Sequence, residues 1–152
     1  MNYPVWDVED VMFDVEEEVL PEVESYSYDY KERETFVTGS GKTRRCDAAD
    51  AYVFWVMKCV ATERYAHEAY SSDFGVEFLE IMRQNYPRSI AESEIRRSIK
   101  EALLVDNRTI NVFNFRFNWQ ADMCYITFGA ESVYGIDTVT VERGGYSSGR
   151  IN

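Results

Sequence analysis

The sequence predicts one α+β domain, in which a short N-terminal β-hairpin and about three helices precede a C-terminal, mostly antiparallel sheet. The chain has 152 residues, enough for one sizeable core and too few for two ordinary domains. Helical periodicity fills the middle of the chain, and alternating β-branched and aromatic residues fill its last third. We therefore expect an acidic arm over residues 1–24, the folded domain over residues 25–143 and a flexible Gly/Ser-rich tail over residues 144–152.

The first expected element is a β-hairpin within residues 25–38, which read SYSYDYKERETFVT. Tyr26, Tyr28 and Tyr30 alternate with polar residues, and the later letters TFV are again β-prone. This pattern predicts two short strands around Lys31–Glu34.

The first helix is expected to begin after Asp47 and to run to about Tyr65. Asp47 is a suitable N-cap, and Asp50 places a carboxylate in the first turn. Apolar residues with helical spacing form one face of this segment: Tyr52, Val53, Val56, Met57 and Val60.

Two more helices are expected before the sheet. A short one that ends before Pro87 is indicated by four apolar residues: Val76, Phe78, Leu79 and Met82. Ser89 and Glu92 have the spacing of a capping box at the start of the other. Its apolar face consists of Ile95, Ile99, Ala102 and Leu103, and its end is expected near Asp106.

Three strands are expected after Arg108. In the segment RTINVFNFRFNW, apolar residues alternate with polar ones, first at even-numbered positions up to Val112 and then at odd-numbered positions from Phe113. This change predicts a strand with a bulge or twist near Val112 and Phe113. The segment DMCYITFG predicts a second strand. Val139 and Val141 mark a third.

The charge of the chain is concentrated at its N-terminus. There are 16 Lys and Arg residues against 27 Asp and Glu residues, a net charge of −11, which argues against nucleic acid or an anionic membrane as the main partner. Residues 1–24 contribute −9 and contain no basic residue, which leaves −2 for the rest. Apolar residues are interspersed in this acidic arm. It either packs on its own domain or stays disordered, or it orders against a basic partner surface.

Cysteine and histidine usage points away from disulfides and metal. Cys46, Cys59 and Cys124 are odd in number and lack CxxC spacing, and His67 is the single histidine. We expect reduced thiols that fill the core, no metal and no cofactor. No basic segment followed by an apolar one opens the chain, so synthesis in the cytoplasm is expected.

The stretch TGSGKT, Thr38 to Thr43, resembles a phosphate-binding loop but lacks two of its requirements. The pattern GxxxxGK[ST] places a glycine where this chain has Phe36. Three residues also separate Thr43 from Asp47, so Lys42 and Thr43 would not lie at a helix N-terminus. Nucleotide binding is therefore not expected.

Catalytic groups are weakly indicated. Glu63, Glu68 and Glu77 lie near aromatic residues, and a glycosidase needs two carboxylates about 5 to 10 Å apart. His67 could pair with Cys59 or Ser71, although a histidine at a helix end is usually a surface group. No segment singles out a catalytic residue.

Several phrases resemble one known family. They are TGSGKTRRCD, TERYAHEAYSSDFGVEF and IRRSIKEALLVDNRTINVFNFRF. Together they are similar to the baseplate wedge proteins of contractile phage tails, also called sheath initiators, whose family name carries the label lysozyme-like. The version resembled is that of myophages, defective prophages and R-type bacteriocins of Gram-positive hosts. The family's signature, a helix ending in Glu-Pro-Arg before the first sheet strand, corresponds here to Asp106, Asn107 and Arg108.

The resemblance implies a non-catalytic structural protein of a tail baseplate, in a virion or bacteriocin particle assembled in the host cytoplasm. Its expected partners are the tail sheath protein, baseplate wedge proteins and tube or hub proteins. It is expected to be monomeric when free and sixfold around the tail. Asp106, Asn107 and Arg108 would contact the wedge, although Arg108 could instead form a salt bridge within its own domain. The expected sheath template comprises Met123, Tyr125, Thr127, Val139 and Val141.

Two other function classes remain open from the sequence. The label lysozyme-like would suit a peptidoglycan-cleaving enzyme, which requires one carboxyl with a raised pKa beside a second carboxylate. A cytoplasmic adaptor of the same fold would instead use the acidic arm to attract its partner.

Overall fold

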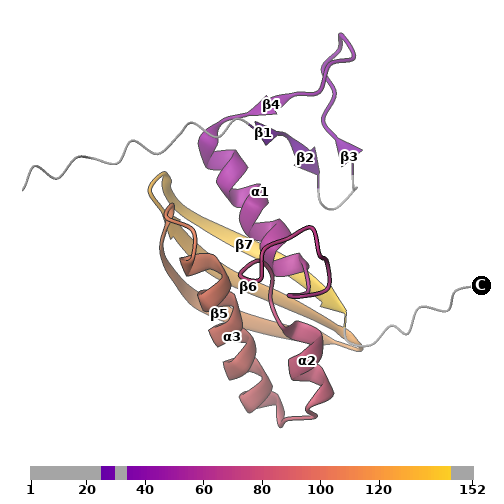
Figure 1. Ribbon diagram of the computed structural model, residues 1–152, viewed down its shortest axis with the longest axis vertical. Helices are drawn as coiled ribbons and strands as arrows, with labels where there is room; N and C mark the ends of the chain where they lie inside the picture. The colour runs from indigo at the N-terminus through magenta and orange to yellow at the C-terminus, as the bar shows by residue number, and fades with distance from the viewer. Residues whose placement is uncertain (1–24, 30–33, 145–152) are drawn as a thin grey trace, which may run out of the picture.

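The computed structural model describes residues 25–29 and 34–144. Its ten elements include a three-stranded sheet with helices on one face and two short strand pairs (Figure 1). The elements are β1 (Ser25–Tyr26), β2 (Tyr28–Asp29), β3 (Glu34–Thr35), β4 (Arg45–Cys46), α1 (Ala48–Ala61), α2 (Phe78–Arg83), α3 (Arg88–Leu104), β5 (Thr109–Gln120), β6 (Met123–Ser132) and β7 (Gly135–Gly144). This arrangement confirms the predicted α+β class. The acidic arm, most of the tail and residues 30–33 lie outside the described residues.

The N-terminal strands form two short antiparallel pairs. Strand β2 pairs with β3, as predicted, and β1 pairs with β4, which the sequence pattern had not indicated. Between β3 and β4 the chain makes a hairpin that is closed by a bridge between Val37 and Thr43. Gly41 has φ +76° in its turn, a conformation that favours glycine. We call residues 36–45 the basic hairpin, because Lys42, Arg44 and Arg45 lie in it.

Helix α1 begins as predicted and ends earlier than predicted. The Asp47 carboxylate accepts the N–H of Asp50 at 2.8 Å, which confirms the N-cap. The helix ends at Ala61 rather than near Tyr65. The reason is a parallel bridge between Glu63 and Val76, which draws the chain into an extended conformation directly after the helix. Thr62 caps the end by donating its hydroxyl to Lys58 O at 2.7 Å.

Helix α3 begins one residue before Ser89, so the predicted capping box is wrong. Pro87 is the N-cap and provides no side-chain hydrogen bond. Its fixed φ suits a helix start, and Ser89 is therefore already inside the helix. Glu92 instead accepts the indole N–H of Trp119 at 2.8 Å, which ties α3 to β5.

The C-terminal sheet has the order β5–β6–β7 and is antiparallel throughout. Strand β5 carries the predicted irregularity: its register shifts between Phe113 and Arg116, and Asn114 has φ +55°. The extra residue lets Val112 and the later aromatic residues face the same side despite the change of phase. Helix α1 packs on β7 and α3 packs on β5, so the core lies between this face and the helices.

The core contains the predicted thiols. Cys46, Cys59 and Cys124 are all free and buried. Burial, with a smaller contribution from nearby Glu92, raises the pKa of Cys124 to about 11, so this thiol stays protonated. Among the described residues, no helix combines the length and apolar character needed to cross a membrane.

Candidate functional site

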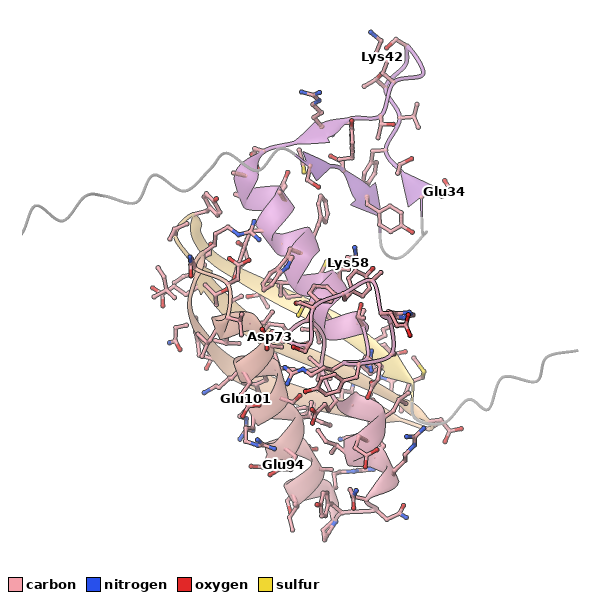
Figure 2. All side chains as sticks on the ribbon, in the orientation of Figure 1. Glu34, Lys42, Lys58, Asp73, Glu94 and Glu101 are labelled. Carbon is pink, nitrogen blue, oxygen red and sulfur yellow. The ribbon has the colours of Figure 1, made fainter. Side chains whose placement is uncertain are left out.

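The TGSGKT stretch is a hairpin turn and forms no phosphate cradle. Thr38 N–H donates to Lys42 O at 2.8 Å, and Gly41 N–H donates to Thr38 O at 2.8 Å. These amides are used within the turn, and Figure 2 shows Lys42 at its tip, away from the helices. A phosphate loop needs free amides beside a helix N-terminus, whereas this turn lies away from the start of α1 and uses the amides of Thr38 and Gly41 internally.

Two of the three carboxylates weighed above for acid–base catalysis are held in structural contacts. Glu63 accepts hydrogen bonds from Arg143 at 2.5 Å and from Leu79 N–H at 2.9 Å, and Glu77 lies 3.9 Å from Arg64. Glu68 is exposed. Both oxygens of Glu63 are thus engaged in structural contacts rather than free to act on a substrate.

His67 and Cys59, weighed above as a possible nucleophile pair, lie in different surroundings. His67 is exposed and packs edge-on against Tyr70, with 5.8 Å between ring centroids. Cys59 is fully buried, and burial raises the pKa of its thiol, so it is a poor nucleophile. Within residues 25–29 and 34–144, no three His, Cys, Asp or Glu residues are placed to hold a metal.

Asp106, Asn107 and Arg108 form the tight turn between α3 and β5. The Arg108 side chain donates two hydrogen bonds to the Asp106 carboxylate, at 2.9 and 2.8 Å. The Arg108 backbone N–H donates a third at 2.9 Å. Its guanidinium also lies 5.5 Å from the ring centroids of both Tyr52 and Trp55. The salt bridge within the domain is therefore present, and only 12% of the Arg108 side chain is exposed.

The pKa values of this pair favour the charged forms. Burial raises the pKa of Asp106, but the hydrogen bonds and charge of Arg108 outweigh it, so the pKa of Asp106 lies below its ordinary 3.8. The hydrogen bonding of the Arg108 side chain to the Asp106 carboxylate is the main cause that raises the pKa of Arg108. The pair therefore braces the turn at neutral pH.

Stability from this pair is expected to be lost in acid. Because the folded-state pKa of Asp106 is lowered, its contribution is complete above about pH 4 and disappears as the pH falls through the folded-state value. Asp106→Asn should cost about 1–3 kcal/mol at neutral pH and less near pH 2.5, which is below the ordinary pKa of 3.8, so that part of the stability from the ionised carboxylate is already lost. Urea unfolding at both pH values measures this, and an equal cost at both would contradict it.

Exposed apolar residues surround this turn. We call them the apolar end: Leu104, Val105, Ile110, Val133, Tyr134 and Ile136. They come from the end of α3, the start of β5 and the β6–β7 turn, which meet where Val133 N–H donates to Arg108 O at 3.0 Å (Figure 1). Apolar exposure gathered at one end of a domain is typical of a surface that a partner covers.

The residues of the predicted sheath template lie on two strands with different places in the sheet. Met123, Tyr125 and Thr127 lie on β6, whose backbone pairs with β5 on one side and β7 on the other. A strand paired on both sides cannot accept another, so an added strand could join this hairpin only at β7. Val139 and Val141 lie on β7, which is an edge strand, and their side chains are buried.

The hydrogen-bonding direction of β7 follows from the turn that precedes it. Thr109 and Ser132 are opposite each other in β5 and β6, and the hydrogen bond from Val133 N–H to Arg108 O joins the residues next to them. Thr109 and Ser132 are therefore a pair without hydrogen bonds to each other, and the backbone N–H and C=O of Ser132 face β7. Alternation along β6 and β7 then directs the backbone N–H and C=O of four described residues away from the sheet: Ile136, Thr138, Thr140 and Glu142.

The opposite edge, β5, is less open. Its bulge between Phe113 and Arg116 interrupts the ladder, and the Asn111 side chain accepts the N–H of Val112 at 2.9 Å. Bulges and local side-chain bonds are means by which proteins prevent an edge from pairing. Strand β7, by contrast, stays in register with β6 over its whole length. The sequence could not show this difference, because it depends on strand order.

Comparison with known proteins assigns the family. Residues 24–135 match the family model described as contractile injection system sheath initiator. The chain is also 28% identical over 133 residues to the phage-like element PBSX protein XkdS of Bacillus subtilis (strain 168), covering 87% of this chain and 89% of that protein. The matched region includes the Asp106–Arg108 turn and strands β5 and β6. The chain belongs to the contractile injection system sheath initiator family and is a structural component of a contractile tail.

Proposed function

We propose that this protein joins the inner baseplate wedge to the first ring of sheath subunits, and that a sheath strand adds to the free edge of β7. The observation that carries the proposal is the row of outward backbone groups on β7, at Ile136, Thr138, Thr140 and Glu142. A long, regular and unprotected edge is a hazard in a free monomer and a template in an assembly. The protein acts without catalysis, in six copies around the tail of a phage or bacteriocin-like particle.

The side chains of β7 suit this role. Residues of even number, such as Thr138 and Thr140, lie on the face without helices, where Thr140 shares a 2.9 Å hydroxyl hydrogen bond with Thr127 of β6. Val139 and Val141 anchor the strand in the core from its other face. Strand β7 is thus already ordered while its outer edge remains available to a partner strand. Addition of a strand therefore costs little conformational entropy in β7 itself.

The decisive experiment is polymerisation of the cognate sheath subunit around tail tubes, with and without this protein. We expect the lag before sheath growth to shorten when the protein is present on the baseplate. If sheath grows equally well without it, the templating role is wrong. A muralytic assay of the same sample separates this role from peptidoglycan cleavage.

The apolar end is the proposed wedge contact, with Asp106, Asn107 and Arg108 at its centre. Since the Arg108 side chain is mostly covered, we infer that it holds the turn in shape while the surrounding apolar side chains supply most of the buried area. Asn107 is exposed within the same turn and is positioned for a direct contact.

Two substitutions separate bracing from contact. Val105→Asp changes a side chain that is 58% exposed, so it should leave stability unchanged and weaken wedge binding about tenfold or more. Arg108→Ala should leave the domain folded, with a loss of about 1–3 kcal/mol, and should also impair wedge incorporation. Thermal unfolding and co-purification with the wedge proteins measure the two effects. If Arg108→Ala unfolds the isolated domain, its role is internal.

A further inference from the structure

One face of α3 carries a row of cations that covers aromatic rings of β5. Arg88, Glu92, Arg96 and Lys100 recur every four residues and therefore lie along one side of the helix. Arg88 lies 5.4 Å from the Trp119 ring, Arg96 lies 5.7 Å from Phe115, and Lys100 lies 5.9 Å from Phe115. We call Arg88, Arg96, Lys100 and the rings of Phe115, Phe117 and Trp119 the cation–aromatic stripe.

Within the described part of the chain, Arg88, Arg96 and Lys100 form no ion pair. Two carboxylates lie beside these cations: Glu92, which accepts the indole N–H of Trp119, and Asp122, which lines the same hollow as Arg88. The next residue around the helix behaves differently: Arg97 forms ion pairs with Glu94 at 2.7 Å and Glu101 at 3.0 Å. Figure 2 labels both of these acids on α3. The described ion pairs on α3 are thus those of Arg97, whereas Arg88, Arg96 and Lys100 lie over aromatic rings.

The stripe also offers apolar space and backbone donors. At its lower end, a hollow of about 380 Å³ lies between the α2–α3 turn and β5, with Met82, Tyr86, Ala91 and Trp119 among its walls. After the bulge, alternation directs the backbone N–H groups of Phe117 and Trp119 away from β6. A segment that combines carboxylates with apolar side chains would satisfy all of these groups.

We propose that the acidic arm of the same chain, residues 1–24, docks along the cation–aromatic stripe. The arm carries nine carboxylates and no cation, with apolar residues such as Trp6 and Phe13 between them. Its length suffices, because about 24 extended residues reach up to about 80 Å, whereas the 17 residues of α3 span only about 25 Å. Tethering favours the chain's own arm over that of another copy. The docked arm covers the β5 edge and leaves β7 as the open one.

The basic hairpin is the competing surface, and it fits the arm less well. Lys42, Arg44 and Arg45 are exposed on a narrow hairpin that projects from the domain. Neither the hollow beside Trp119 nor the one lined by Glu63, Arg64 and Leu79 includes these three residues. A purely ionic contact at such a place is worth little in water, whereas the stripe adds apolar burial to the charge.

The test uses the full chain and a carbodiimide that joins carboxylates directly to amines. We expect cross-links from carboxylates of residues 1–24 to Lys100, identified by mass spectrometry. In a mixture of ¹⁵N-labelled and unlabelled protein, the cross-linked peptides should carry the same label, which shows that each cross-link forms within one chain. Cross-links that join two chains, or that go to Lys42 and not to Lys100, would overturn the proposal.

A second measurement does not depend on an amine. The arm contains many cleavage sites for a glutamate-specific protease, and docking should protect them. Arg88→Gln with Arg96→Gln and Lys100→Gln should raise the cleavage rate about tenfold at low salt. The matched control, Lys42→Gln with Arg44→Gln and Arg45→Gln, removes three charges from the hairpin and should leave the rate unchanged. Thermal unfolding verifies that both variants fold, and equal cleavage rates in wild type and the stripe variant would refute the docking. Sheath growth is not involved, so this result is independent of the templating role.

Discussion

Proline at both Thr138 and Thr140 is expected to abolish sheath nucleation while leaving the domain folded. Both residues direct their backbone N–H groups away from β6, so proline removes two donors from the free edge and none from the β6–β7 ladder. Each lost hydrogen bond is worth about 1 kcal/mol, and the proline rings also hinder the approach of a strand. We therefore expect at least about a thirtyfold loss in the nucleation rate. The measurement is sheath growth on tubes that carry wild-type or variant protein.

Two controls make this result specific to the backbone. Thr138→Val with Thr140→Val removes the hydroxyls and keeps both N–H groups, so it should nucleate sheath nearly as well as wild type. Val139→Pro removes a donor that faces β6 and should destabilise the domain itself. If the double proline variant folds and nucleates normally, β7 is not the template. If the valine variant fails as badly as the proline variant, the hydroxyl groups carry the contact instead.

The sequence predicted which segments form helices and strands better than it predicted the order of the strands in the sheet. Val139 and Val141 alternate clearly enough to indicate a strand, and the change of phase in β5 indicated its bulge. Nothing local indicates whether a strand lies at the centre or the edge of a sheet, because strand order is fixed by contacts between distant residues. Met123, Tyr125 and Thr127 were therefore assigned to the template although β6 is central. The resemblance at Asp106 and Arg108 to the family signature, by contrast, rests on a short motif within one turn, where residues close in sequence are also close in space.

Glu92 shows how tertiary contacts override a local signal. Its spacing from Ser89 suits a capping box, yet the carboxylate bonds to Trp119, 27 residues away. Pro87 already provides the start of the helix, so Glu92 is free to serve the packing of α3 on β5. A similar long-range contact, between Glu63 and Arg143, escaped prediction because 80 residues separate its partners.

Glu63 and Arg143 join three elements at the end of β7. Arg143 donates to Glu63 at 2.5 Å and to the Ala61 carbonyl oxygen at the end of α1. The other oxygen of Glu63 accepts the N–H of Leu79 in α2. The Arg143 guanidinium lies 5.0 Å from the Phe78 ring, and burial lowers its pKa against the opposing effect of Glu63. This buried pair therefore fixes the α1–α2 connection to the strand proposed as the sheath template.

Arg143→Met is expected to be the most destabilising single change at an ion pair in the domain. It leaves the Glu63 carboxylate partly buried without its cation, at a cost of about 3–5 kcal/mol. Adding Glu63→Gln should recover part of that cost, because the amide oxygen still accepts the Leu79 N–H and no charge remains buried. Arg97→Met, which breaks exposed pairs on α3, serves as the matched control and should change stability little. Urea unfolding of the four proteins gives the coupling between the two sites directly. A double variant less stable than Arg143→Met alone would show that Glu63 stabilises the fold through Leu79 rather than through its charge on Arg143.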